Sequence, residues 1–98
     1  MFVEIGGLIK KGLGQQVIKR FSKKKGVITV GVAKGRAKDL FDINEFGDAG
    51  ETEILTIIVV EKSSDNLFDE LYKFLQLDKK KQGVIYKYFT IHKVSFSK

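Results

Sequence analysis

Two short segments combine glycine with basic side chains, a combination that proteins use to bind anions. One is Lys34-Gly35-Arg36, with Lys38 close behind, and the other is Lys79-Lys80-Lys81-Gln82-Gly83. Glycine beside lysine at a strand end lets backbone N–H groups and ammonium charges converge on one anion. Lysines also neutralise a phosphate as point charges. Neither segment has a Walker or dinucleotide-binding fingerprint. The residues alone therefore leave two interpretations, an anion site and an ordinary surface turn.

The acidic residues between 39 and 53 include the spacing of a calcium-binding loop. Asp42, Asn44, Gly47 and Glu53 fall at EF-hand positions, but Phe46 stands where an oxygen ligand is required. The flanking segments are typical of strands, whereas an EF-hand loop joins two helices. We therefore expect no metal site of this kind. The sequence does not decide whether the acidic segment binds a cation in another way.

Side chains suited to catalysis are few. His92 is the only histidine, and no serine, aspartate or cysteine is spaced with it as in a catalytic triad. Paired carboxylates occur only in the acidic segment, which we expect to be a loop too mobile to position an acid and a base. We therefore expect a protein that is not an enzyme.

The composition is that of a single folded domain. The chain has 98 residues, of which 43% are hydrophobic, so we expect one domain over residues 1–98. The absence of cysteine excludes disulfides and thiolate metal clusters. The longest uncharged apolar run, residues 54–60, is far shorter than the ~20 residues of a membrane span. No signal peptide is evident, because Glu4 precedes the first positive charge, and we expect a cytoplasmic protein.

The formal net charge of +6 is distributed unevenly along the chain. Every charge from Ile5 to Lys38 is positive, and every charge from Asp39 to Glu53 is negative. A basic balance permits nucleic acid, phosphorylated ligands or an acidic membrane surface as partners, but it does not choose among them.

Hydrophobic periodicity predicts four strands and two helices. The strands are expected over residues 2–9, 27–33, 53–60 and 84–91. The first helix has the apolar stripe Leu13, Val17 and Phe21 and runs to about Lys24. We expect Gly26 to stop it in the usual C-terminal position.

The second helix is expected to begin with N-cap chemistry at Ser63-Ser64-Asp65. Its buried stripe is Leu67, Leu71 and Leu75. The element order is then β-α-β-β-α-β, which predicts an α+β fold of the ferredoxin-like kind. Such a sandwich has a four-stranded antiparallel sheet with both helices on one face.

The other face of such a sheet is left bare in a monomer. We expect Tyr86, Tyr88 or Phe89 on it, and an exposed apolar patch of this kind usually marks a subunit or ligand interface. The same element order serves RNA-recognition domains, and residues 81–89 faintly resemble their aromatic motif. That motif belongs on the third strand, which here carries no aromatic residue. A nucleic-acid-binding module is therefore the alternative prediction.

The connection between the second and third strands is unusually long. About nineteen residues separate Ala33 from Glu53, where ~2–5 are usual in a hairpin. Loops of this length in compact domains are generally functional. Four apolar residues in it have no evident core position, and we expect them to bind a partner protein: Leu40, Phe41, Ile43 and Phe46. The alternative is that they pack locally, as a short helix on their own subunit.

Taken together, these segments resemble the P-II signal-transduction superfamily. The resemblance lies in Val30-Gly31-Val32-Ala33-Lys34-Gly35 leading into a long loop, in Glu53–Val60, and in Gly83-Val84-Ile85-Tyr86 opening the last strand. It covers nearly the whole chain in element order and is closest to short, divergent P-II-like proteins rather than to the main nitrogen regulatory proteins. Residues 35–52 would correspond to the family's T-loop.

The resemblance implies a homotrimer that binds adenine nucleotides in the clefts between subunits. It also implies that the long loop regulates a partner, often a membrane transporter. By position, Lys34, Gly35, Arg36 and Lys38 would line the nucleotide cleft. Gly6 and Gly7 would provide a close backbone approach, and Lys79, Lys80, Lys81, Gln82 and Gly83 would stand where the family's glycine-rich B-loop meets the phosphates.

The chain departs from the family at several positions. Val84 follows Gly83 where the family has a lysine, and Ser95 and Ser97 occupy positions that are usually basic. The loop has no tyrosine, so regulation by uridylylation is not expected. The effector is therefore left open among ATP, ADP, AMP, a cyclic nucleotide and an unrelated anion. A structural trimer whose ligand site has decayed is a further alternative.

Overall fold

The first strand is an inner strand of the sheet, and its side chains are buried on the face that packs into the core. β1 (Phe2–Lys10) places Val3, Ile5 and Ile9 on one face, and all three are at most 1% exposed. It pairs antiparallel on one side with β3 (Thr52–Val60) and on the other with β4 (Gly83–Ile91). The computed structural model describes residues 1–35, 52–80 and 82–91.

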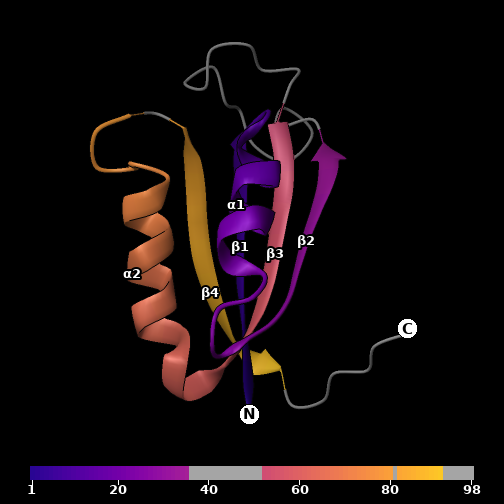
Figure 1. Ribbon diagram of the computed structural model, residues 1–98, viewed down its shortest axis with the longest axis vertical. Coiled ribbons are helices and arrows are strands. Elements are labelled where there is room, and N and C mark those ends of the chain that lie inside the picture. Colours follow the sequence, from indigo (N-terminus) through magenta and orange to yellow (C-terminus); the bar gives the residue numbers. More distant parts are fainter. Residues whose placement is uncertain (36–51, 81, 92–98) are drawn as a thin grey trace.

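The second strand, β2 (Val27–Gly35), pairs antiparallel with β3 and completes a sheet of order β2-β3-β1-β4 (Figure 1). β1 therefore stands between two strands that come much later in the chain, and β2 and β4 are the edges. This is the predicted α+β, ferredoxin-like arrangement, and the fold class is confirmed.

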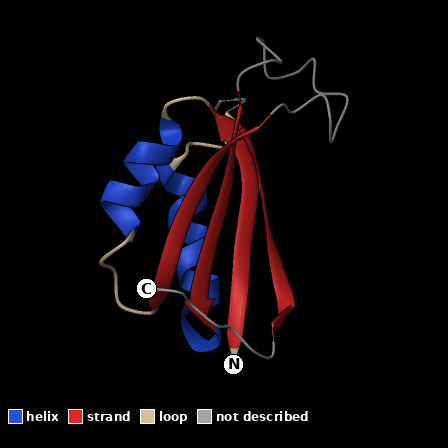
Figure 2. Cartoon of the chain, turned by 90° about the vertical axis from the view of Figure 1, so that its right-hand side faces the viewer, coloured by secondary structure: helices blue, strands red, loops and turns tan. Residues whose placement is uncertain are grey.

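Both helices cover the same face of this sheet (Figure 2). α1 (Leu13–Phe21) buries Val17 and Phe21, and α2 (Ser64–Phe74) buries Leu67 and Leu71, as their spacing predicts. The helical stripes meet the inward side chains of β1 and β3 in one core. Its members are Val3, Ile5, Ile9, Val17, Phe21, Leu55, Ile57, Val59, Leu67, Leu71 and Leu75.

A lysine joins the second helix to the edge of the sheet. Lys87 projects from β4 on the helix-covered face and forms an ion pair with Asp65 of α2. Its ammonium group lies 5.8 Å from the centre of the Phe68 ring. The long side chain thus covers apolar surface with its methylene groups while its charge is paired, which is how lysine is tolerated at such a position.

Two predicted helix ends differ from the structure. α1 ends at Phe21, with Ser22 as its C-cap, so Gly26 does not terminate it; Gly26, at φ +91°, forms the turn into β2 instead. Ser63 stands at the N-cap of α2 but makes no capping hydrogen bond. The reason is the 3-10 turn η3 (Glu61–Ser63), which gives Ser63 a helical backbone instead of the extended one a cap requires.

Neither of the described helices is long and apolar enough to cross a membrane.

Candidate functional site

One end of the sheet brings together residues that are far apart in the sequence. Strand pairing places Lys34 of β2, Glu53 of β3, Ile9 of β1 and Gly83 of β4 in a single row across the sheet. One step beyond it, the Lys10 N–H donates to the carbonyl of Gln82 at 2.8 Å. The two glycine-lysine segments of the sequence therefore lie at the same end, where β2 leads into residue 36 and β3 begins.

The two segments lie on opposite edges of that end. Lys34 and Gly35 belong to β2, and the turn with Lys79 and Lys80 leads into β4. Neighbouring strands are ~4.8 Å apart, so three spacings separate the edges by about 14 Å. Within one chain, the described lysines of the two segments, Lys34 on one side and Lys79 with Lys80 on the other, thus belong to opposite edges of the sheet.

A carboxylate occupies the N-terminus of α1. Glu53 Oε1 accepts hydrogen bonds from the backbone N–H groups of Gly14 at 2.8 Å and Gly12 at 3.2 Å. These are two of the donors that the first turn of a helix leaves unpaired, and a negative charge there is favourable. An incoming anion therefore finds this helix terminus already filled.

Glycine is required at position 14 for this contact. A Cβ at Gly14 would lie 2.6 Å from a methyl carbon of Val32 and 2.7 Å from Glu53 Oε1. Lys34 lies directly across from Glu53, yet in the described part of the chain the two form no ion pair. The Glu53 carboxylate is engaged with α1, so the charge of Lys34 stays uncompensated and exposed.

The turn before β4 satisfies its own backbone. The N–H groups of Lys79 and Lys80 both donate to the carbonyl of Gln76, and the Gln82 N–H donates to the carbonyl of Lys80. The side-chain amide of Gln82 donates to the carbonyl of Leu75 at 2.7 Å. The turn itself uses these three N–H groups, so they are not available to an anion. The predicted convergence at Lys81–Gly83 also involves Lys81, which lies outside the described residues. What remains for a ligand is the pair of exposed lysine ammonium groups, Lys79 and Lys80.

The two glycines of β1 lie in the middle of the strand, away from the basic end. A Cβ at Gly6 would lie 2.6 Å from the Tyr86 ring, on the face opposite the helices. A Cβ at Gly7, on the helix-covered face, would lie 2.9 Å from Ile85 Cγ2 and closer still to the Val84 carbonyl. Contacts with β4 within the chain thus account for both glycines without a ligand.

The remaining predicted site residues lie outside the described residues. They are Arg36, Lys38 and Lys81, with the apolar residues Leu40, Phe41, Ile43 and Phe46. The calcium-like pattern, except for Glu53, and His92 also fall there. Among the described residues no three metal-ligating side chains come together.

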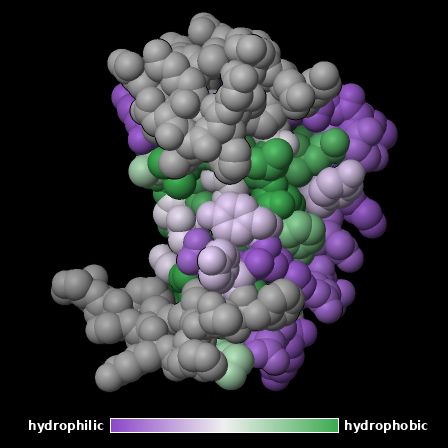
Figure 3. All heavy atoms as spheres, turned by 180° about the vertical axis from the view of Figure 1, so that it is seen from behind, coloured by the Kyte–Doolittle hydropathy of each residue, from purple (hydrophilic) through white to green (hydrophobic). Residues whose placement is uncertain are grey.

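The face of the sheet without helices is apolar along β4. Val84, Tyr86 and Tyr88 are 44%, 46% and 58% exposed, and the two tyrosine rings meet edge to face with centroids 6.3 Å apart. Hydrophobic side chains occupy part of this face in the space-filling view, beside paler and hydrophilic ones (Figure 3). Leu8 and Ile58 lie on it as well but are buried. The predicted placement of Tyr86 and Tyr88 is confirmed.

The sequence identified Glu53 only as a position of the calcium-like pattern and as the start of a predicted strand, and did not predict its contact with α1. Its partner Gly14 lies 39 positions away, so no local pattern links them. The only signal was indirect: Glu53 opens the third strand, and Lys34 closes the second.

Comparison with known proteins gives no assignment for this end of the sheet or for the chain. No protein-family model, no curated protein and no solved structure matches it. The placement of the basic and apolar residues and the resemblance in sequence are therefore what bear on function.

Proposed function

We propose that this chain is a P-II-like regulatory protein. It is a homotrimer that binds a small anionic effector, an adenine nucleotide, between subunits, and it regulates a partner protein. The observation that carries the proposal is the placement of basic groups at one end of the sheet but on its opposite edges, Lys34 on β2 and Lys79 with Lys80 beside β4.

Opposite edges are what a site shared between subunits needs. In a cyclic trimer the contacts are head to tail, so each interface joins two different surfaces of the subunit. If the β2 edge of one copy lies beside the β4 edge of the next, Lys34 of the first meets Lys79 and Lys80 of the second. Basic groups that stand on opposite edges of the sheet in one chain then converge on one phosphate.

The open face of the sheet supplies an interface for such an assembly. Val84, Tyr86 and Tyr88 present exposed apolar surface in a continuous line on β4. Removing apolar surface from water contributes about 25 cal/mol per Å². An apolar face of this kind is typical of subunit contacts, and we expect it to be covered in the trimer.

Binding at this end can act on the long connecting segment. β2 ends and β3 begins there, so a ligand that contacts Lys34 sits at the base of residues 36–51. The effector then shifts the population of that segment's conformations, provided that it binds them with different affinity. The segment would contact the partner, a membrane transporter in the proposed role, through Leu40, Phe41, Ile43 and Phe46.

Calorimetric titration tests the nucleotide site. ATP, ADP, AMP, cyclic AMP and cyclic di-AMP are titrated into the purified protein, and sedimentation gives its oligomeric state. We expect saturation near one ligand per subunit and a weakening of about tenfold or more in Lys34→Ala, because a charge-assisted contact is worth ~1.5–3 kcal/mol. The matched control is Lys19→Ala, an exposed lysine on α1 that should leave the affinity unchanged.

The outcomes separate the parts of the proposal. No binding by a trimeric protein would favour a structural trimer with a decayed site. Equal losses of nucleotide affinity in the Lys34 and Lys19 variants would show that only the net charge of the protein matters. That result would refute a nucleotide site at Lys34. A monomer would remove the shared site altogether.

The exposed tyrosines favour a second candidate, binding of single-stranded nucleic acid. Tyr86 and Tyr88 lie side by side on an open sheet face of a basic protein, and bases stack on such rings. This candidate predicts a steep loss of affinity with salt and a dependence on Tyr88. It also requires the open face to be uncovered, so a trimer closed through that face would exclude it.

A further inference from the structure

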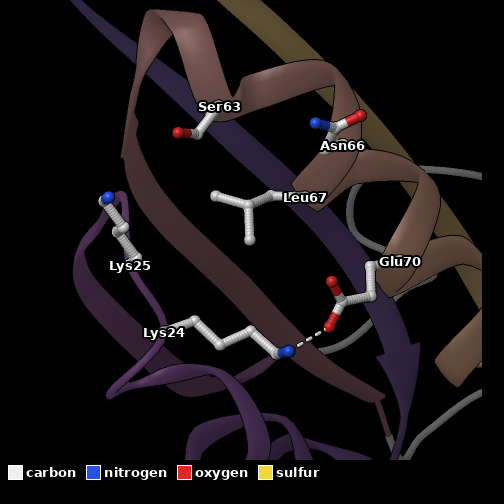
Figure 4. A pocket seen from close by; sticks show the side chains of 6 residues that line it. All are labelled: Lys24, Lys25, Ser63, Asn66, Leu67 and Glu70. Atoms are coloured by element: carbon white, nitrogen blue, oxygen red, sulfur yellow. Dashed lines mark ion pairs between the residues drawn. The ribbon is translucent and has the colours of Figure 1, made fainter.

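A cavity of about 300 Å³ lies at the end of the molecule opposite the basic row. It opens between the turn that joins α1 to β2 and the start of α2 (Figure 4). Six residues line it: Lys24, Lys25, Ser63, Asn66, Leu67 and Glu70. Its volume is at the lower end of the range for small-molecule sites.

One side of the cavity is closed by an ion pair. Lys24 of the turn pairs with Glu70 of α2, so the two elements that form the walls are joined across the opening. The Lys24 ammonium also lies 5.6 Å from the centre of the Phe21 ring. Its charge is therefore paired within the chain.

The neighbouring lysine, Lys25, differs from Lys24 in having no ion-pair partner among the described residues. Lys25 is exposed and lines the same cavity. Two lysines and one glutamate line this cavity, and the glutamate pairs with Lys24, so the Lys25 charge has no partner among the lining residues. Such a charge attracts an anion, while the Lys24–Glu70 pair carries no net charge as a unit.

Two polar side chains complete the wall. The Ser63 hydroxyl is not used to cap α2 and lies against Gly26, where a Cβ would be 2.6 Å from Ser63 Oγ. Asn66, one turn into the helix, lines the cavity beside it and carries an amide donor. Leu67 supplies an apolar surface between these donors and the ion pair (Figure 4).

We propose that this cavity binds a small molecule through a single anionic group, a carboxylate or a phosphate. Lys25 supplies the charge, and Ser63 and Asn66 supply hydrogen bonds. Leu67, which is 6% exposed, offers a small apolar contact to the ligand, and the Lys24–Glu70 pair closes one side of the site. This second site is independent of the nucleotide site, because it shares no residue with it and lies at the other end of the sheet.

Backbone amide NMR tests the site with two probes, acetate and inorganic phosphate, each titrated at constant ionic strength. We expect saturable shifts of the amides of Lys25, Ser63 and Asn66 with one of the probes at least, and the better probe identifies the anionic group. Lys25→Gln should weaken binding about fivefold, the upper range for an exposed charge contact. Lys23→Gln is the matched control, because Lys23 is an exposed lysine of the same turn that does not line the cavity.

The proposal is overturned if neither probe gives saturable shifts there. It is also overturned if Lys23→Gln weakens binding as much as Lys25→Gln, because the attraction would then be a property of the whole basic turn. Lys34→Ala should leave these shifts unchanged. Failure of this site and failure of the nucleotide site are therefore distinguishable.

Discussion

The two faces of the sheet are built from the same strands but differ in what covers them. Under the helices, Val3 and Ile5 of β1 and Leu55 of β3 are at most 1% exposed. On the other face, Tyr86 and Tyr88 of β4 are about half exposed. The same alternation of side chains thus produces a closed core on one side and an apolar surface on the other.

The difference predicts which substitutions act on folding and which act on the proposed assembly. The helix-covered face is complete within one chain, since both amphipathic helices pack on it. The open face presents aromatic surface that no described helix covers, and a soluble monomer rarely exposes a large patch of that kind. Substitutions on the first face should therefore act on folding, and those on the second should act on assembly.

The largest effect on folding is expected from the covered face. Leu71→Ala removes a fully buried side chain of α2 and should lower the free energy of unfolding by about 2–5 kcal/mol. The control is Tyr72→Ala on the same helix, whose exposed ring should cost less than about 1 kcal/mol. Urea denaturation at one fixed protein concentration measures both. Equal losses would mean that the helix-covered face is not the main core.

Alanine substitutions at the adjacent residues Gly6 and Gly7 compare the two faces directly, because each new methyl group points to a different face. Gly7→Ala should destabilise by about 1–3 kcal/mol, because the new methyl meets the backbone of β4 at Val84 and the Ile85 side chain. Gly6→Ala should cost less, since its methyl meets the Tyr86 ring, which can turn away from the sheet. The same denaturation experiment measures the order of the two variants, and a larger loss in Gly6→Ala would contradict it.

A smaller effect is expected at the basic end, where Glu53 caps α1. Glu53→Ala removes the acceptor for Gly12 and Gly14 and should cost about 1–2 kcal/mol, as loss of a helix cap does. Glu53→Gln keeps an oxygen acceptor without the charge and should lose less. Urea midpoints of the three proteins give the order. A neutral Glu53→Ala would show that the contact contributes nothing.

Local patterns predicted the elements because their causes are local. Val17 and Phe21, or Leu67 and Leu71, lie one turn apart on one face of a helix, and spacing alone puts them in the core. The predicted stop at Gly26 was wrong for a related reason. Glycine predicts a left-handed turn, which the structure has, but it does not say whether the helix ends before that turn or at it.

The candidate site was less predictable because it depends on contacts between distant segments. Strand order brings Lys34 and Gly83 to one end, and the element order was enough to anticipate that. It could not show that Glu53 fills the N-terminus of α1, or that Gln76 accepts the N–H groups of Lys79 and Lys80. These contacts depend on how α1 and the turn pack against the rest of the chain, and hydrophobic periodicity does not predict that.

The smallest effect on folding, and the sharpest test of the comparison, is expected on the open face. Tyr88 is 58% exposed, so Tyr88→Ser should change the stability of the isolated chain by no more than about 0.5 kcal/mol. If the open face joins subunits, however, the same change removes a central aromatic contact, and such contacts often contribute about 2 kcal/mol or more to binding. Sedimentation over a range of protein concentrations should then show self-association weakened by tenfold or more.

The matched control for that experiment is Tyr72→Ser. Tyr72 is 39% exposed, carries the same ring and lies on α2, away from the open face. It should leave self-association unchanged. The stability of an oligomer depends on protein concentration. If the open face joins subunits, the unfolding midpoint of the parent protein should therefore rise with concentration, and the Tyr88 variant should lose that rise. If both tyrosine variants associate like the parent, the open face is not the subunit interface, and its aromatic surface remains accessible to a nucleic acid.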